Sequence, residues 1–229
     1  MRHQLGPDYS DFHNSLDRPA PVSVRHNPGK INNFFGDPVP WCLHGRYLQE
    51  RPVFTLDPKL HAGAYYVQEA SSMFVEQAVR QSTDLSKSLN VLDLCAAPGG
   101  KSTHLLSLLS KDSLLISNEV IRSRASILSE NIQKWGHDNV IVTHSDPSNF
   151  GRMPGFFDLI LLDAPCSGEG LFRKEPEAMR EWSLPNVDHC SVRQKRILSD
   201  VWPALRPGGI LCFLFRYRCT SNKLEYPPA

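Results

Sequence analysis

The feature that most constrains the fold is the stretch Val-Leu-Asp-Leu-Cys-Ala-Ala-Pro-Gly-Gly-Lys-Ser at residues 91–102. An apolar, strand-like run ends there in small residues and two glycines, and a helix-like run follows at 103–109. Glycines at a strand-to-helix turn let a ligand approach the backbone closely, and the amides at the start of the helix face that ligand. An ordinary tight turn has the same pattern. The polar residues at neighbouring strand ends favour a nucleotide-type site.

Strand-like and helix-like segments alternate from residue 89 onward. The expected strands are 91–94, 114–117, 140–143, 157–162 and 209–215, and the expected helices are 102–109, 121–135 and 186–205. This alternation predicts βαβ units and an α/β fold with a Rossmann-like, doubly wound, mostly parallel sheet. Right-handed crossovers place helices on both faces, and the carboxyl ends of the strands form the functional edge.

Residues 1–62 are expected to form a separate, small and irregular N-terminal segment, with the main domain at 63–229. This segment is rich in Pro, Asn, Gly and His, and its prolines interrupt any long helix. Two short apolar patches, 39–43 and 52–56, are candidate strands. Apolar residues at helical spacing predict a helix over 65–80.

The composition is that of a soluble globular protein, with 229 residues, 41% hydrophobic and 21% charged. No apolar run is long enough to span a bilayer, and the first residues lack the apolar core of a signal peptide. The six cysteines form no Cys-x-x-Cys pair, which favours reduced thiols in a cytoplasmic protein without a zinc site or a disulfide framework. A net charge of +1 neither indicates nor excludes a nucleic-acid partner. We expect a monomer that binds no metal.

Four carboxylates follow predicted strands, namely Asp93, Glu119, Asp146 and Asp163. Glu119 lies about two dozen residues beyond the glycine turn, a spacing that suits the two hydroxyls of a ribose. A helix N-cap is the alternative role for each acid taken singly. The turn is neither Gly-x-Gly-x-x-Gly nor a phosphate loop. A ribose plus a small zwitterion, as in S-adenosylmethionine, therefore fits it better than ATP or NAD.

Cys166 lies in the loop Asp-Ala-Pro-Cys-Ser-Gly-Glu-Gly that follows a predicted strand. A cysteine among turn-forming residues is placed as a reactive thiol, and attack on an electron-poor ring carbon requires a thiolate. A small buried apolar cysteine is the alternative. Arg173 and Lys174 follow closely and either hold phosphate or solvate a loop.

The motifs at 93–101 and 163–168 resemble those of the RNA cytosine-C5 methyltransferase family, the Sun/Nop group. The segments 63–73 and 170–178 resemble its bacterial ribosomal-RNA branch. This resemblance implies a class I methyltransferase fold, S-adenosyl-L-methionine as cofactor and RNA, in particular ribosomal RNA, as substrate. Residues 1–62 would then be part of an RNA-substrate subdomain.

The resemblance also implies roles for individual residues. The segment that would wrap the methionine part of the cofactor consists of Cys95, Ala96, Ala97, Pro98, Gly99, Gly100 and Lys101. Glu119 would hold the ribose hydroxyls, and Asp146 would lie by the adenine. Asp163 would sit near the sulfonium and the target base, with Lys101 also reaching the cytosine. In this family a cysteine on the final strand attacks cytosine C6, and the cysteine equivalent to Cys166 assists product release.

The sequence departs from the family pattern after Pro-Gly-Gly-Ile-Leu at 207–211. A Tyr-Ser-Thr-Cys-Thr-like run is expected there. By register from Gly209, Arg216 occupies the place of the nucleophile, and Cys219 is a candidate displaced equivalent. We therefore expect an incomplete final strand and an atypical or truncated C-terminus. Two functions stay open, an enzyme that uses Cys166 or Cys219, and a catalytically impaired fragment that binds cofactor or RNA.

Overall fold

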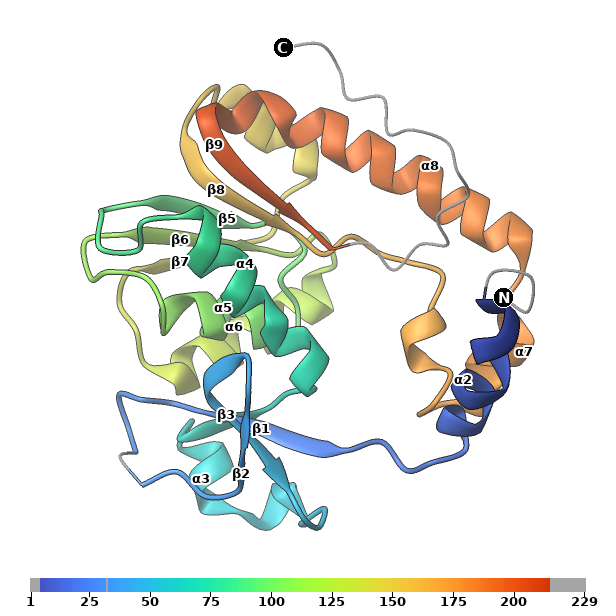
Figure 1. Ribbon diagram of the computed structural model, residues 1–229. Helices are drawn as coiled ribbons and strands as arrows, with labels where there is room; N and C mark the ends of the chain where they lie inside the picture. The colour runs from blue at the N-terminus through green and yellow to red at the C-terminus, as the bar shows by residue number, and fades with distance from the viewer. Residues whose placement is uncertain (1–4, 32, 215–229) are drawn as a thin grey trace.

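The computed structural model describes residues 5–31 and 33–214 and contains two β-sheets (Figure 1). The larger sheet has five parallel strands in the spatial order β7-β6-β5-β8-β9. Their bounds are β5 Asn90–Asp93, β6 Leu114–Asn118, β7 Val140–Thr143, β8 Phe157–Leu162 and β9 Leu205–Phe213. The chain starts at the centre of the sheet, runs to one edge and then crosses to the other. This order confirms the predicted Rossmann-like, doubly wound α/β fold.

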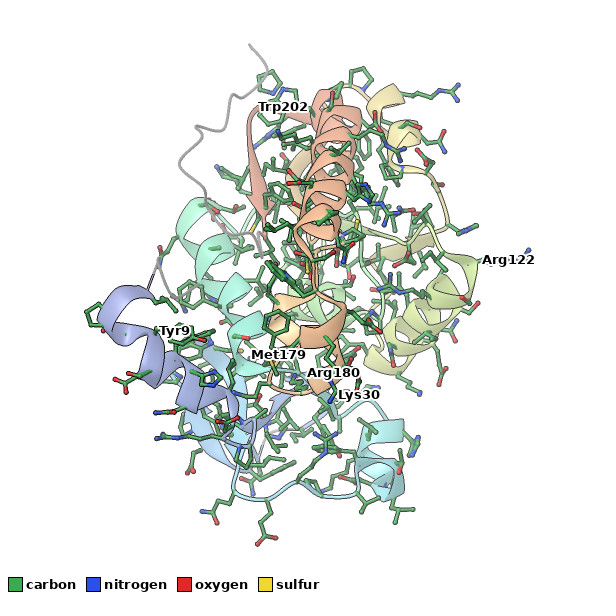
Figure 2. All side chains as sticks on the ribbon, turned by 90° about the vertical axis from the view of Figure 1, so that its right-hand side faces the viewer. Tyr9, Lys30, Arg122, Met179, Arg180 and Trp202 are labelled. Carbon is green, nitrogen blue, oxygen red and sulfur yellow. The ribbon has the colours of Figure 1, made fainter. Side chains whose placement is uncertain are left out.

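Helices cover both faces of the parallel sheet because successive strand residues point to opposite sides. Val91 packs in a cluster with α4 (Val75–Ser82), α5 (Gly100–Leu106) and α6 (Arg122–Trp135). Leu92 packs in a second cluster with α8 (Leu184–Val201) and the short 3-10 segments η4 (Pro147–Arg152) and η6 (Trp202–Ala204). Figure 2 shows Trp202 at one end of α8, and Met179 and Arg180 of α7 (Pro176–Glu181) toward the other.

The observed elements of this half differ from the predicted ones mainly at their ends. The helix expected at 186–205 is α8, which Ser183 caps by accepting a hydrogen bond from the Asn186 amide, 3.4 Å away. It ends earlier than predicted, because Pro203 has no amide proton to continue a helix and the chain is extended from Leu205. The last strand accordingly begins at Leu205 rather than at residue 209.

The prediction of an irregular N-terminal segment is wrong, because three strands within residues 1–62 join a fourth strand just beyond it in an antiparallel sheet of order β2-β3-β1-β4. Its strands are β1 Val22–His26, β2 Asp37–Val39, β3 Cys42–Leu48 and β4 Tyr65–Val67. The candidate strand at 39–43 is the turn of the hairpin that joins β2 to β3. The candidate strand at 52–56 is instead a single 3-10 turn, η2 (Phe54–Leu56).

The helix predicted over 65–80 is interrupted. Tyr65–Val67 forms β4, and the helical part is the 3-10 segment η3 (Ala70–Phe74) followed by α4. Two tyrosines and a valine favour an extended backbone, and β4 pairs with β1 through Val24 and Val67. Tertiary pairing therefore overrides the helical spacing of the apolar residues in this segment.

The remaining short elements lie at the N-terminus and in loops. They are η1 (Gly6–Asp8), α2 (Tyr9–Leu16), α3 (Pro58–His61) and η5 (Glu169–Leu171). Within the ranges that the structure describes, no helix combines the length and the apolar character needed to cross a bilayer.

Candidate active site

The glycine turn lies at the carboxyl end of the central strand, as the sequence predicts. Gly99 has φ +112°, a left-handed conformation that favours glycine, and a Cβ at this position would lie 3.2 Å from Leu128 Cδ1. Two side chains of α6 fix the turn by donating hydrogen bonds to its backbone carbonyls. Arg124 donates to the Ala97 carbonyl over 2.9 Å, and Asn131 donates to the Pro98 carbonyl over 2.8 Å. Hydrogen bonds from α6 thus fix the backbone of the turn.

Asn118 fixes the ends of three neighbouring strands. Its side-chain nitrogen donates to the carbonyls of Leu94 (3.2 Å) and Ser145 (3.0 Å). Its side-chain oxygen accepts from the Thr143 hydroxyl (2.8 Å) and the Ser145 amide (3.0 Å). Asn118 is buried and was not among the predicted site residues. A single buried amide that bonds only to backbone and hydroxyl groups leaves no motif in the sequence.

Asp93 is fully buried at the end of β5. Its Oδ2 accepts a hydrogen bond from the Ser102 hydroxyl over 2.6 Å, whereas its Oδ1 has no partner among the described residues. Burial raises the pKa of the Asp93 carboxyl to about 6, and the negative charges of Asp163 and Glu119 act in the same direction. This strand end is therefore an electronegative site that favours a cation.

Glu119 follows β6 and is 3% exposed. Its Oε1 accepts from the Ile121 amide over 3.0 Å, and its Oε2 lies 3.3 Å from Nη1 of Arg124. Since the same arginine also holds the Ala97 carbonyl, Glu119 is tied to the glycine turn through one side chain. The structure thus brings Glu119 to the same edge as the turn and Asp93.

Asp146 is exposed and caps η4. Its Oδ1 accepts from the Ser148 amide over 3.0 Å and from the Ser148 hydroxyl over 2.7 Å. These hydrogen bonds lower the pKa of the Asp146 carboxyl. Asp146 therefore acts as an N-cap, which is the alternative role that the sequence leaves open for each acid.

Lys101 and Asp163 form an ion pair of 2.6 Å between Nζ and Oδ2. Lys101 lies in the first turn of α5 beside the glycine turn, and Asp163 directly follows β8, so the pair joins the two motifs of the sequence across the sheet edge. Both side chains are partly exposed, at 17% and 29%. A ligand at the sheet edge can therefore contact both side chains.

Cys166 is half-buried in the loop after Asp163. Gln194 of α8 donates to the Pro165 carbonyl over 3.0 Å and so holds this loop. Burial raises the pKa of Cys95, in the glycine turn, to about 12, which makes it a poor thiolate. The second candidate thiol, Cys219, and Arg216 lie outside the described residues.

Arg25 of β1 connects the N-terminal sheet to α5. Its guanidinium donates to Gln68 Oε1 (2.8 Å), the Gly100 carbonyl (3.1 Å) and the Thr103 hydroxyl (2.6 Å). It also lies 4.5 Å from the centre of the Trp135 ring. Arg25 therefore positions the N-terminal sheet against the glycine turn.

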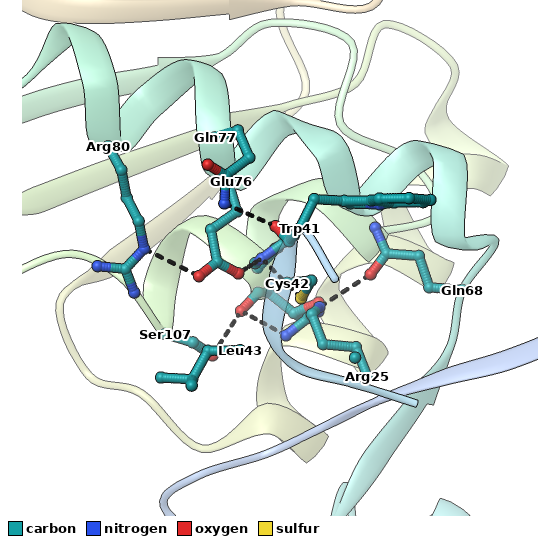
Figure 3. A network of polar contacts seen from close by, with 12 residues as sticks. Arg25, Trp41, Cys42, Leu43, Gln68, Glu76, Gln77, Arg80 and Ser107 are labelled. Carbon is teal, nitrogen blue, oxygen red and sulfur yellow. Dashed lines mark hydrogen bonds and ion pairs between the residues drawn. The ribbon is translucent and has the colours of Figure 1, made fainter. Parts of the chain in front are cut away.

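A second buried network adjoins it (Figure 3). Glu76 accepts from Arg80 and from His104, each over 2.9 Å, and Cys42 Sγ lies 3.7 Å from His104 Nε2. Burial opposes ionisation of Glu76, but hydrogen bonds from His104, Cys42 and Arg80 outweigh it and lower its pKa to about 2.

The donor atoms of Cys42, Glu76 and His104 lie within 4.8 Å of one another, which makes them the one potential metal-ligand group of this kind in the described part of the chain. Because Glu76 is already paired, and positively charged Arg80 bonds to it directly, we interpret the group as a hydrogen-bond network. The expectation that the protein binds no metal stays a prediction.

The basic loop residues that the sequence singles out lie next to the N-terminal part. Lys174 forms a 2.6 Å ion pair with Glu69, which precedes η3. Arg173 is exposed on the same loop. Both cations therefore lie where the loop after Cys166 meets the N-terminal part of the chain.

Comparison with known families gives two matches that together cover most of the chain. The family described as 16S rRNA methyltransferase RsmB/F matches residues 82–223. The N-terminal domain of 16S rRNA methyltransferase RsmF matches residues 1–70.

Curated relatives have the same description. Ribosomal RNA small subunit methyltransferase F of Aeromonas salmonicida (strain A449) is 38% identical over 231 residues, which cover 94% of this chain and 48% of the relative. Its namesake in Escherichia coli O7:K1 (strain IAI39 / ExPEC) is 35% identical over 234 residues, with 95% and 48% covered. The chain thus spans about half the length of the curated relatives that it matches.

Solved structures share the fold. A methyltransferase homolog protein from Pyrococcus horikoshii has a TM-score of 0.74 and 30% identity over 90% of this chain and 68% of its own. The crystal structure of PH0851 has a TM-score of 0.82 at 24% identity, with 93% and 50% covered. NSun6 from Pyrococcus horikoshii with SFG has a TM-score of 0.77 at 17% identity, with 93% and 80% covered. The last two show similarity of fold alone.

Proposed function

Because the chain belongs to the RsmB/F family of 16S rRNA methyltransferases, we propose that it uses S-adenosylmethionine to methylate C5 of a cytosine in ribosomal RNA, in the cytoplasm. The family membership confirms the resemblance drawn from the two sequence motifs. The observation that carries the proposal is the Lys101–Asp163 ion pair, which joins the glycine turn to the loop of Cys166.

The residues at the sheet edge fit this cofactor. S-adenosylmethionine supplies an electrophilic methyl group on a positively charged sulfonium. Oδ1 of Asp93, which has no hydrogen-bond partner among residues 5–31 and 33–214, favours a cation, and Glu119 provides a buried carboxylate that can accept hydrogen bonds from ribose hydroxyls. In our proposal the segment 95–101 wraps the methionine part, Glu119 holds the ribose, and Asp146 lies by the adenine.

The proposed methyl transfer gives each of the remaining groups a role. Cytosine C5 is a poor nucleophile, and addition of a thiolate at C6 makes it enamine-like. Lys101, held in place by Asp163, then stabilises the negative charge that develops around N3 of the ring. After C5 has taken the methyl group, a base removes the C5 proton, and the thiolate leaves as the C5–C6 double bond re-forms. Cys166 and Cys219 are the candidate thiols.

RNA would approach across Arg173, Lys174 and the N-terminal sheet. The Lys174–Glu69 pair supports this, because it links the loop after Cys166 with the N-terminal part. We retain the division of the chain near residue 62 as a proposal, with the first part serving the RNA substrate.

A second candidate function is a module that binds cofactor or RNA without transferring methyl groups. The observation that favours it is Arg216 in the place expected for the nucleophile, because a guanidinium stays protonated and is not nucleophilic. Only the first candidate requires transfer of a methyl group.

The test measures binding and transfer separately. We expect Glu119→Gln to weaken binding of S-adenosylmethionine about tenfold in calorimetry, since it removes charge-assisted hydrogen bonds to the ribose. Glu130→Gln is the control, because Glu130 is an exposed carboxylate on α6. Unchanged affinity in Glu119→Gln would remove the ribose assignment.

Transfer is followed as tritium incorporated from S-adenosylmethionine into unmodified small-subunit ribosomal RNA. Incorporation into 5-methylcytosine supports the enzyme, and we expect it to depend on Cys166 or Cys219. Cofactor binding without incorporation would support the binding module instead. Full turnover by the Cys166→Ser, Cys219→Ser double variant would defeat the thiol mechanism.

A further inference from the structure

We propose that a cavity beside the reaction site binds the base of a nucleotide that flanks the target cytosine, and that it prefers a base with an exocyclic amino group. This inference rests on the proposed function, since it presumes an RNA substrate. The inference adds a second nucleotide site and a base preference to the proposed function.

The cavity has a volume of about 360 Å³ and lies where α2, the N-terminal sheet and the loop after Cys166 meet. This volume falls within the range of roughly 300–1,000 Å³ that is typical of small-molecule sites. It suits a single nucleoside. Six of the residues that line it carry the argument: Trp41, Tyr47, Glu69, Glu169, Arg173 and Lys174.

The chain itself places this cavity next to the reaction site. Glu169 follows Cys166 by three residues, and Glu69 follows Gln68 directly. The Gln68 side-chain amide lies 3.7 Å from the position that a Cβ on Gly100 of the cofactor turn would take. The cavity is therefore bounded on one side by the loop of the candidate thiol and on another by residues that support the glycine turn.

A flanking base needs a new stacking partner once the target base leaves the helix. Trp41 offers a fixed ring, because its Nε1 donates to the Ala70 carbonyl over 2.7 Å. Tyr47 of β3 supplies a second, half-buried ring. Unpaired RNA bases are commonly recognised by stacking on aromatic side chains. Arg173 and Lys174 add positive charge for the phosphates on either side of the base.

Glu169 supplies the polar preference. Its Oε1 accepts from the Trp182 indole over 2.8 Å and from the Ser167 hydroxyl over 2.7 Å, so the orientation of the carboxylate is fixed. Its Oε2 is buried and has no hydrogen-bond partner in the described part of the chain. A buried carboxylate oxygen without a donor is costly, and a base whose amino group displaces the side chains that cover the oxygen and donates to it gains the corresponding free energy.

This oxygen distinguishes between bases. Adenine, cytosine and guanine each carry an exocyclic amino group that donates to a carboxylate. Uracil has one N–H on the same edge, but carbonyl oxygens flank it on both sides and face a carboxylate unfavourably. The site should therefore favour an amino-bearing base over uracil next to the target.

The experiment measures binding of fluorescein-labelled heptaribonucleotides to the full chain by fluorescence anisotropy at constant salt. The reference RNA has a central cytidine among uridines. Two others carry one adenosine, before or after the cytidine, and a fourth has an abasic ribose in the position that responds. We expect one adenosine RNA to bind about tenfold more tightly than the reference, and the abasic RNA to lose this gain.

Glu169→Gln tests the carboxylate directly. The Trp182 and Ser167 donors should hold the glutamine oxygen in place of Oε1, which leaves an amide donor where Oε2 stood. We expect the preference for adenosine to disappear or to reverse toward uridine, because uracil oxygens accept from an amide. Glu181→Gln is the matched control, since it removes the same charge from an exposed residue that does not line the cavity.

The outcomes separate the two proposals. Equal affinity for adenosine and uridine RNAs, or an unchanged preference in Glu169→Gln, overturns the flanking-base site and leaves the proposed function standing. If no RNA binds while calorimetry shows binding of S-adenosylmethionine, the RNA part of the proposed function fails and the flanking-base site fails with it.

Discussion

The buried carboxyl of Asp93 makes the free energy of unfolding depend on pH, and this dependence can be measured in solution. Its pKa is raised by burial from 3.8 to about 6, so the folded state binds its proton more tightly than the unfolded state. The free energy of unfolding contributed by this group therefore falls as pH rises from about 4 to about 6. We expect Asp93→Asn to abolish this fall, as measured by urea unfolding at several pH values from about 4 to 7.

Two buried histidines act in the opposite direction over an overlapping range. Burial lowers the pKa of His26 and of His104 to about 4, so both are neutral in the folded protein and favour folding as pH rises. The informative quantity is consequently the difference between the wild type and Asp93→Asn at each pH. A difference that stays constant across the range would contradict the raised pKa of Asp93.

The sequence predicts which side chains gather at the sheet edge better than it predicts which side chains hold the loops there. Lys101 and Asp163 are 62 residues apart and meet at the predicted strand ends, because parallel strands end at a common edge. Asn118, Arg124 and Gln194 were missed. Each bonds to backbone carbonyls of a loop, and such contacts depend on tertiary distances that no local spacing records.

At the scale of elements, the turn between β5 and α5 requires glycine for two separate reasons. Gly99 has φ +112°, and a Cβ there would also lie 3.2 Å from Leu128 Cδ1. We expect Gly99→Ala to destabilise the fold by roughly 1–3 kcal/mol from the backbone conformation, with a further cost from the contact. Urea unfolding measures the loss.

Gly168 provides the matched comparison for this prediction. It has φ +86°, and a Cβ there would have no neighbour within 4 Å. Gly168→Ala should therefore show the conformational cost alone. Equal destabilisation in the two variants would mean that packing against α6 does not constrain the glycine turn.

The alternation of strands and helices in the sequence is sufficient to predict the parallel sheet. It does not predict the N-terminal sheet. The central parallel strands are mostly apolar and buried on both faces, as residues 159–162 of β8 are. The N-terminal strands are short, carry prolines and glycines, and pair across sequence gaps of up to about 40 residues, as Val24 does with Val67. Periodicity within a window cannot show such pairing.

At the scale of the whole molecule, one buried side chain couples the two sheets. Arg25 is 1% exposed, and its guanidinium bonds to Gly100 and Thr103 of α5 and stacks on Trp135 of α6. Arg25→Met fills a similar volume but leaves these acceptors unpaired. Because each hydrogen bond to a charged group contributes roughly 1.5–3 kcal/mol, we expect a loss of about 3 kcal/mol or more in the free energy of unfolding.

The loss should also change how the molecule unfolds, because the N-terminal sheet contacts the cofactor turn through the same side chain. We expect Arg25→Met to weaken binding of S-adenosylmethionine and to let a protease cleave the N-terminal sheet before the parallel sheet. Arg46→Met is the control, since Arg46 of β3 donates to the carbonyls of Leu43 and Gly45 and lies 5.1 Å from the centre of the Phe34 ring, all within the N-terminal part. If Arg46→Met weakened cofactor binding as much as Arg25→Met, the effect would come from general loosening of the N-terminal sheet. A specific loss with Arg25→Met, and a single cooperative transition in the control, would show that Arg25 transmits the position of the N-terminal sheet to the cofactor turn.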